Sequence, residues 1–334
     1  MNLNPGKTEF TDGEHVQLRR EVERVKGLDK LTEAQIAREA DLPASTLNSY
    51  LKGKYQGSDD PVAVALFRWL EARRTAAEVR SRMPAKPSFQ PLATSQAITS
   101  RIHYARAMGR IVVISGVPGV SKTATAMQYC SDTPRAWLST MDPATSGVPT
   151  MLLELLAAMG INDVRGTPQQ LSRRVVAKVM EAESVIVIDE SQHLSDKAIE
   201  QLRSINDKTR QMGRGVGIVL MGNEEAYSKI GPTGTKAAFA QVSSRIAQRR
   251  YIQTPLREDV AAMAQAWADV NREIIGPKEV DFLVQIAMTP GGLRNVEMTF
   301  EGALIAAFGA QQPLSLAHLK GAFGSITDLT QRGA

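Results

Sequence analysis

Residues 112–127, VVISGVPGVSKTATAM, decide the fold, because they join a β-branched run to a helix-forming run through a loop with two glycines. The loop follows the pattern G-x-x-x-x-G-K-[ST], in which backbone amides at a helix start cradle phosphates. Ser121 stands where the pattern has its last glycine. Serine is small and common at helix starts, where its hydroxyl can satisfy a free amide or meet a phosphate. We therefore expect Ser121 to weaken nucleotide binding without abolishing it.

The strand–loop–helix order around this loop gives its residues specific tasks. Lys122 is placed to reach the β- and γ-phosphates of ATP, and the Thr123 hydroxyl is placed to ligate Mg²⁺. Gly116 and Gly119 let the backbone bend around the phosphates. The loop residues that we expect to bind ATP are Gly116, Val117, Pro118, Gly119, Val120, Ser121, Lys122 and Thr123.

Two later apolar runs end in residues that complete an ATP site. In VIVIDE, residues 185–190, Asp189 is placed to hold Mg²⁺, and Glu190 is placed to orient and deprotonate the attacking water. GIVLMGN, residues 217–223, ends in Asn223, which is placed to hold a water beside the γ-phosphate. An ordinary turn residue is the alternative interpretation of Asn223.

Arginines further along the chain are candidates for contact with the γ-phosphate. In SSRIAQRR, residues 243–250, we expect Arg245, or failing it Arg249, to reach the nucleotide of a neighbouring subunit and stabilise the transition state. A patch that contacts DNA phosphates is the competing interpretation. Arg294 follows a Gly-Gly break at a helix start and is placed to reach the nucleotide of its own chain.

Short β-branched runs alternate with amphipathic helical stretches in the middle of the chain. The runs are RIVVIS (110–115), RAWLST (135–140), SVIVIDE (184–190) and GVGIVLMGN (215–223). This alternation is typical of a parallel sheet covered by helices on both faces. The prolines of MPAKPSFQP interrupt helix and indicate a linker. The predicted domains are an all-helical domain at 1–82, a linker at 83–92, an α/β core at 93–254 and a helical lid at 255–334.

The all-helical domain contains a candidate helix–turn–helix in LTEAQIAREADLPASTLNSYLKGKY, residues 31–55. We expect Ile36 and Ala37 to pack inward, Ser45 to cap the second helix, and Asn48 and Ser49 to be exposed. Short polar residues suit base edges and lysines suit phosphates. The predicted DNA contacts here are Ser45, Thr46, Asn48, Lys52 and Lys54. A helical bundle used for protein contacts is the alternative.

Positive charge is concentrated within the second half of the chain. Residues 203–257 hold ten Lys and Arg against three Asp and Glu, whereas the whole chain has a net charge of +5. This concentration favours a polyanionic partner, with a solvated basic face as the alternative. The candidates for a DNA-facing surface are Lys208, Arg210 and Arg214.

The remaining composition favours a cytoplasmic protein. One cysteine, Cys130, allows no internal disulfide and fits a reducing compartment. The first residues, MNLNPGKTEFTDGEH, show no apolar signal segment, and no apolar run approaches the length that spans a bilayer. We expect no membrane partner.

Taken together, these stretches resemble the transposition protein B family of phage Mu, whose members are AAA+ ATPases. The resemblance covers nearly the whole chain, from LNSYLKGKYQG through VVISGVPGVSKT, IVIDESQHL, GIVLMGN and FAQVSSRIAQRR to TPGGLRN. It implies that Lys122 and Thr123 bind ATP and Mg²⁺, and that Asp189 and Glu190 serve hydrolysis. It also implies that Asn223 is the sensor asparagine, Arg245 the finger and Arg294 the second sensor. The family usually has glycine at the position of Ser121.

The resemblance further implies an activity and partners. ATP-bound subunits of this family form a helical filament on double-stranded DNA with little sequence preference. They deliver that DNA to the transposase, stimulate strand transfer, and leave the DNA upon ATP hydrolysis. A phage-encoded member would act in the host bacterial cytoplasm. Two alternatives stay open: a helicase-loader-like ATPase, and a regulator that binds one operator and uses ATP only to gate oligomerisation.

Overall fold

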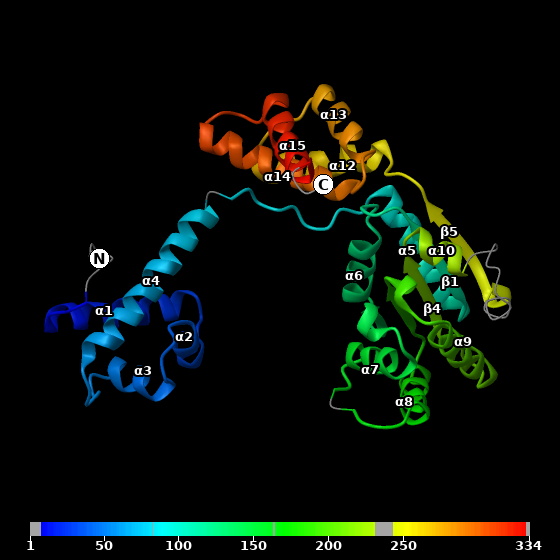
Figure 1. The fold of residues 1–334 in the computed structure, drawn as a ribbon, viewed down its shortest axis with the longest axis horizontal. Coiled ribbons are helices and arrows are strands. Elements are labelled where there is room, and N and C mark those ends of the chain that lie inside the picture. The colour runs from blue at the N-terminus through cyan, green and yellow to red at the C-terminus, as the bar shows by residue number, and fades with distance from the viewer. Residues whose placement is uncertain (1–7, 82, 163, 231–242, 332–334) are drawn as a thin grey trace. The chain divides into compact units, whose positions relative to one another are not determined.

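Five parallel strands form the central sheet of the larger of two units into which the chain divides, Met1–Met83 and Pro84–Ala334. The computed structural model describes residues 8–81, 83–162, 164–230 and 243–331. The strands are β1 (Ile111–Gly116), β2 (Ala136–Thr140), β3 (Val185–Asp189), β4 (Gly217–Gly222) and β5 (Ile246–Ile252). Their spatial order is β2-β3-β4-β1-β5, and every pairing is parallel (Figure 1). The predicted parallel sheet is confirmed.

Helices cover both faces of this sheet, because side chains along each strand alternate between the faces. Ile186 and Ile188 pack into one apolar cluster, whereas Val185 and Val187 pack into another. The first cluster includes α7 (Val148–Ala158), α8 (Pro168–Met180) and α9 (Asp196–Gln211); the second includes α5 (Ala93–Met108) and α6 (Lys122–Asp132). Two short 3₁₀ turns, η1 (Pro143–Thr145) and η2 (Ser191–His193), and α10 (Glu224–Ile230) follow strands β2, β3 and β4.

The fifth strand is absent from the predicted runs. Its sequence, IAQRRYI, is mostly polar, and only its terminal residues Ile246 and Ile252 are buried. β5 pairs with β1 alone and forms an edge of the sheet, so most of its side chains need no apolar partner. An edge strand of this kind leaves no apolar run in the sequence.

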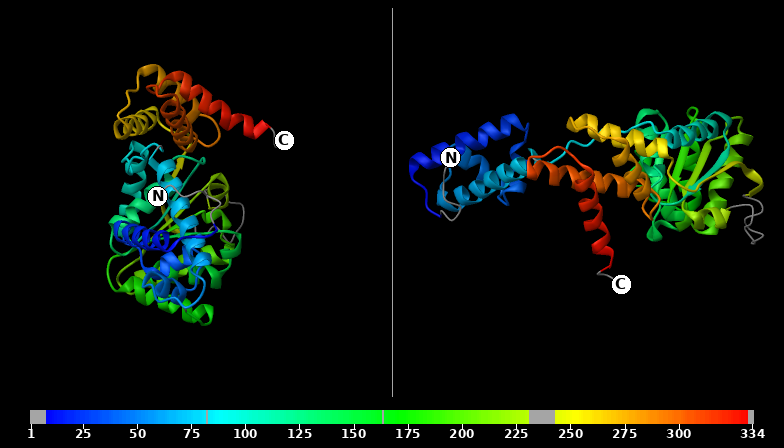
Figure 2. Two further views of the ribbon diagram at one scale, coloured as in Figure 1. Left: turned by 90° about the vertical axis from the view of Figure 1, so that its left-hand side faces the viewer. Right: turned by 90° about the horizontal axis from the view of Figure 1, so that it is seen from above.

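Four helices form the lid that follows β5 within the same unit. They are α12 (Arg257–Asn271), α13 (Pro277–Ala287), α14 (Leu293–Ala310) and α15 (Leu316–Gln331). Trp267 and Phe300 lie at the centre of their apolar core, with ring centroids 5.9 Å apart. Leu92, from the segment before α5, packs into the same core. α15 crosses α14, and its C-terminal end projects beyond the other lid helices (Figure 2).

Every regular element in the described residues of the N-terminal unit is a helix, and the unit has its own core. It contains α1 (Asp12–Leu28), α2 (Glu33–Glu39), α3 (Ala44–Leu51) and α4 (Asp59–Ser81). Thr32 begins α2 with a capping box, in which Gln35 bonds back to the Thr32 amide. Ile36 and Ala37 are buried, as predicted, together with Tyr50. In the part of the chain that the structure describes, no helix has both the length and the hydropathy to cross a bilayer.

Candidate nucleotide-binding site

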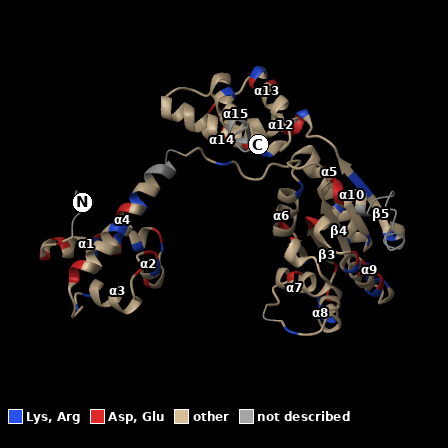
Figure 3. Ribbon diagram, viewed as in Figure 1, with Lys and Arg blue, Asp and Glu red and all other residues tan. Residues whose placement is uncertain are grey.

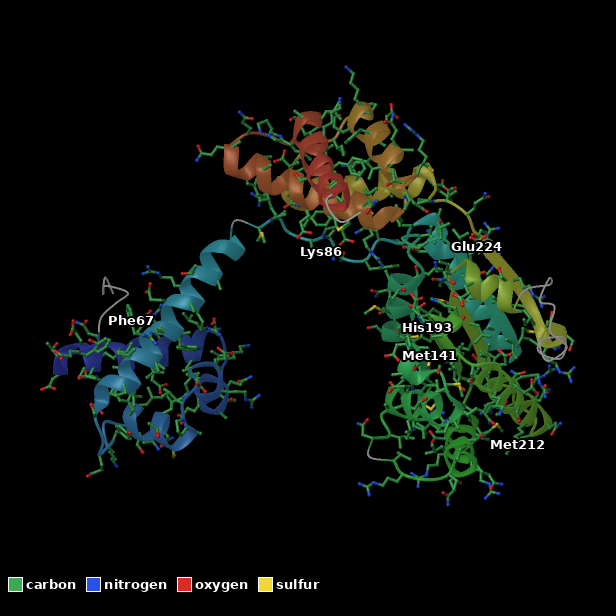
Figure 4. The ribbon with its side chains drawn as sticks, in the orientation of Figure 1. Phe67, Lys86, Met141, His193, Met212 and Glu224 are labelled. Atoms are coloured by element: carbon green, nitrogen blue, oxygen red, sulfur yellow. The ribbon has the colours of Figure 1, made fainter. Side chains whose placement is uncertain are left out.

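The candidate ATP residues from three strands meet at one edge of the sheet, because parallel strands end on the same side. Ser115 of β1 lies opposite Gly222 of β4, and Thr140 of β2 lies opposite Asp189 of β3. The loop after β1, the acidic pair after β3 and Asn223 after β4 therefore share the carboxyl edge. In Figure 4, Glu224 marks this edge at the end of β4, and Met212 marks the opposite edge before β4 begins. Ligands of open α/β sheets bind at the carboxyl edge.

The loop after β1 has the backbone that a phosphate cradle needs. Gly119 has φ +77°, and a Cβ there would lie 1.8 Å from Gly291 O, so only glycine fits. A Cβ at Gly116 would lie 2.3 Å from Ile252 O. The loop runs directly into α6, whose first-turn amides have no partners within the helix. These features fit the triphosphate of a nucleotide.

Ser121 adopts a left-handed conformation, with φ +69° and ψ +9°, at the N-cap of α6. This region favours glycine and costs other residues about 1–2 kcal/mol. Of the two roles considered for the Ser121 hydroxyl, it does not take the first: it accepts no bond from an α6 amide and lies 3.3 Å from the Ser95 hydroxyl. Ser121 therefore keeps the loop's conformation at the cost of backbone strain, and its side chain supplies no cap.

Lys122 is the cation of the loop, and it lies half-buried. Its Nζ donates hydrogen bonds to Gly116 O at 2.8 Å and Val117 O at 2.9 Å. Burial lowers the pKa of Lys122, an effect that the nearby Asp189 and Glu190 carboxylates oppose. The side chain is thus folded back over the loop, where it faces the place that phosphates would take.

Thr123 and Asp189 form the pair predicted to hold Mg²⁺. The Thr123 hydroxyl donates to Asp189 Oδ2 at 2.6 Å, and Asp189 is only 1% exposed. A hydroxyl and a carboxylate are the oxygen ligands that Mg²⁺ takes beside nucleotide phosphates. The chemistry of this pair fits the ion.

Glu190 lies beside this pair and lines the cavity. Its backbone is left-handed, with φ +53° and ψ +40°, a conformation that costs about 1–3 kcal/mol and often marks functional sites. Asn223 lines the same cavity, but its Oδ1 accepts from the Ala226 amide at 3.2 Å. Asn223 therefore does cap the turn into α10, and its Nδ2 is the group left to donate toward a water or phosphate.

The lid reaches the loop directly. The Leu293 amide, at the start of α14, donates to Gly119 O at 2.8 Å, and Gly292 approaches Gly119 so closely that neither position admits a Cβ. The neighbouring Arg294 is exposed and lines the cavity; that it reaches the nucleotide of its own chain stays a prediction.

The cavity between loop and lid has a volume of about 920 Å³, which suits a nucleotide. The linker forms one wall of this cavity. The sequence predicts the linker as a connection between domains and gives no sign of this role. Phe89 of the linker and Met263 and Trp267 of the lid give an apolar end suited to a base. The linker is fastened to the lid, because Asn271 exchanges two hydrogen bonds, of 2.8 and 2.9 Å, with the Ala85 backbone. No local sequence signal reveals this wall, since its partners are far away in the chain.

The two candidate finger arginines lie elsewhere. Arg245 precedes β5 and so lies at the amino edge; seven residues of strand, about 20 Å, separate it from the carboxyl edge. Its Nε lies 3.3 Å from Asp207 Oδ1, and its side chain is 49% exposed. Arg249 donates to Ser243 O at 2.9 Å and Ser243 Oγ at 2.7 Å. Neither arginine lines the cavity of its own chain. Arg245, with one longer ion pair, is held less tightly than Arg249, which makes two hydrogen bonds.

The predicted DNA contacts in the N-terminal unit are only partly exposed. α3 begins after Pro43, so Ser45 is the second helical residue and the predicted capping role is wrong. Asn48 is half-buried and donates to Glu33 Oε2 at 2.6 Å, and Ser49 is half-buried too, so the predicted exposure of both is also wrong. Thr46 is half-buried as well, whereas Ser45, Lys52 and Lys54 are exposed.

The predicted DNA contacts of the core all lie at one end of α9. Lys208, Arg210 and Arg214 are exposed there, on the side of the sheet where β4 begins. Figure 3 shows Lys and Arg along α9 and β5. Arg203 lies in the same helix but is paired with Glu200 and Asp207. The exposed cations Lys208, Arg210 and Arg214 therefore lie away from the nucleotide cavity.

Comparisons with known proteins agree with this architecture. Residues 106–230 match the family model described as AAA domain, and residues 244–326 match Mu B transposition protein, C terminal. Over 298 residues the chain is 33% identical to the ATP-dependent target DNA activator B of Escherichia phage Mu, covering 89% of this chain and 91% of that protein. Over 272 residues it is 30% identical to the Mu-like prophage FluMu DNA transposition protein B of Haemophilus influenzae, covering 81% and 91%.

Solved structures share the fold at much lower identity. The ORC2 protein of Aeropyrum pernix matches with a TM-score of 0.57 and 12% identity, over 72% of this chain and 69% of that chain. A Walker-type ATPase of Pyrococcus abyssi matches with a TM-score of 0.51 and 15% identity, over 75% and 79%. These matches support the AAA+ fold of the core, and the sequence identity across most of both chains shows that this protein belongs to the Mu transposition protein B family.

Proposed function

We propose that this chain is an ATP-dependent activator of transposition targets, which binds double-stranded DNA and delivers it to a transposase. The observation that carries the proposal is the pair of Thr123 and Asp189 beneath a glycine loop, with Glu190 facing the same cavity. The phage Mu relative, named ATP-dependent target DNA activator B, supports the activity toward DNA. The proposed hydrolysis is of ATP to ADP and phosphate.

The loop, the acidic pair and the lid each have a part in this hydrolysis. The loop amides and Lys122 bind the phosphates, and Arg294 reaches them from the lid. Bound Mg²⁺, held by Thr123 and Asp189, would neutralise charge on the β- and γ-phosphates. Glu190 accepts the proton of the water that attacks the γ-phosphorus, while the bond to the ADP oxygen breaks. The linker and lid exclude water from the base end of the cavity.

Assembly completes the site in this proposal. Arg245 lies at the edge of the sheet opposite its own cavity, so it can serve only the cavity of a neighbouring subunit. An arginine supplied in trans accelerates phosphoryl transfer by about 10³–10⁵-fold. ATP hydrolysis would therefore accompany the assembly of subunits into a filament on DNA.

Sequence-tolerant DNA binding fits the exposed residues better than operator recognition. Asn48, the best candidate for reading a base edge, already donates to Glu33. The exposed cations among the predicted DNA contacts are Lys52, Lys54, Lys208, Arg210 and Arg214. These suit phosphates, which carry no sequence information. Affinity for DNA should therefore fall steeply with salt and depend little on sequence.

The test is steady-state ATP hydrolysis with and without double-stranded DNA, with Lys122→Ala as the control. We expect DNA-stimulated turnover in the wild type and none in the variant, together with ATP-dependent binding to unrelated duplexes and ATP-dependent strand transfer by the transposase. Nucleotide-independent binding to one defined DNA site would contradict the proposal and favour an operator-binding regulator. A preference for single strands would favour a helicase loader.

A further inference from the structure

A side chain that sequence motifs leave unassigned holds the carboxylate of Glu190. Gln192 lies two residues further on, in η2, and is 8% exposed. Its Nε2 donates a hydrogen bond to Glu190 Oε2. Its Oε1 accepts from the Asn223 amide at 3.4 Å. One buried amide therefore joins the end of β3 to the end of β4, directly beside the cavity.

The surrounding backbone makes room for this amide. A Cβ at Gly222, the last residue of β4, would lie 2.5 Å from Gln192 Oε1. Glycine at that position thus allows Gln192 to lie against the end of β4. The left-handed backbone of Glu190 turns the chain so that Gln192 folds back toward the carboxylate. Two unusual backbone features therefore support one side-chain contact.

We infer that Gln192 is a positioning residue for hydrolysis: it holds one oxygen of the Glu190 carboxylate and leaves the other directed to the attacking water. The inference rests on the proposed function, which makes Glu190 the base. A base must lie within hydrogen-bond reach of the proton it takes, and a displacement of about 1 Å can cost about 100-fold in rate. Through Asn223, the same amide links the carboxylate to the strand end that faces the γ-phosphate.

The experiment compares Gln192→Met with the wild type. Methionine is unbranched and of similar length, but its thioether cannot donate to the carboxylate. We expect kcat for DNA-stimulated ATP hydrolysis to fall at least about tenfold. The KM for ATP and the affinity for a non-hydrolysable ATP analogue should change by less than about twofold, since Gln192 acts after binding. The matched control is Gln201→Met, whose amide donates to Ser172 Oγ on another part of the core; it should leave kcat unchanged.

A double-mutant cycle separates positioning from general support of the fold. Single-turnover hydrolysis is measured for Glu190→Gln alone and with Gln192→Met. If Gln192 acts through Glu190, the second substitution has no further effect once the base is gone. The inference is overturned if Gln192→Met slows hydrolysis in the Glu190→Gln background as much as it does in the wild type. It is also overturned if Gln192→Met leaves kcat unchanged, or if it raises the KM for ATP by the same factor by which it lowers kcat. Undiminished hydrolysis by Glu190→Gln would instead show that the proposed base is wrong, and the inference would fall with it.

Discussion

Gly119→Ala tests the contact between the phosphate loop and the lid. A Cβ at Gly119 would lie 1.8 Å from Gly291 O, and the Leu293 amide donates to Gly119 O. The loop and the lid turn must therefore separate to admit one methyl group. Gly160→Ala is the matched control, because Gly160 has the same φ of +77° and nothing within 4 Å of its Cβ position.

The two substitutions share the cost of a left-handed alanine, about 1–2 kcal/mol. In both, alanine also makes the unfolded chain less flexible, which raises the free energy of unfolding by about 0.4–1 kcal/mol. Gly119→Ala alone adds the lost hydrogen bond, about 1 kcal/mol, and the overpacking, about 1–3 kcal/mol. We therefore expect it to lower the free energy of unfolding by about 2–4 kcal/mol more than Gly160→Ala does.

Urea unfolding followed by tryptophan fluorescence measures this difference, since Trp267 lies in the lid core next to the loop. A fluorescent ATP analogue measures binding in parallel, and only Gly119→Ala should weaken it. If both variants lost the same stability and Gly119→Ala bound the analogue normally, the lid would not rest on the loop as described.

Three further outcomes are expected. Ser121→Gly should raise the free energy of unfolding by up to about 1 kcal/mol, because it removes left-handed strain; urea unfolding that shows a loss would contradict this. Burial raises the pKa of Tyr50 to about 12, so the unfolded chain ionises this tyrosine at a lower pH than the folded chain does. The free energy of unfolding should therefore fall by about 2–3 kcal/mol as the pH rises from about 10 to about 12, and Tyr50→Phe should remove most of this fall when unfolding is measured against pH. Arg245→Ala and Glu190→Gln should each be inactive as single proteins but recover ATP hydrolysis when mixed on DNA, because both still bind ATP, the first keeps an intact base and the second keeps the finger arginine; a mixture that stays inactive would refute supply in trans.

Much of the candidate site could be predicted from the sequence, because most of its residues lie in short continuous motifs. The loop, Asp189 and Asn223 each end an apolar run, and the ends of parallel strands must share an edge. The left-handed conformation of Ser121 can be expected only because the motif has glycine at this position; a serine by itself does not indicate a left-handed backbone. The wall that the linker adds could not be predicted, because Ala85 and Asn271 are 186 residues apart and the contact uses only the backbone of Ala85, which leaves no pattern in the sequence. The same holds for the amide of Gln192, whose contacts depend on how β3 and β4 end together.

With Arg245 in its proposed role as the finger, the parallel sheet gives a reason to expect that one subunit alone is a poor ATPase. Its carboxyl edge carries the loop, the acidic pair and Asn223, whereas Arg245 and the exposed cations of α9 lie at its amino edge. A strand is too long for one arginine to span, so no rearrangement of side chains can complete the site within a chain. In the proposed filament, head-to-tail stacking would bring the amino edge of one subunit to the carboxyl edge of the next. Such contacts would extend along DNA without closing, and each added subunit would complete a catalytic site at the interface it forms.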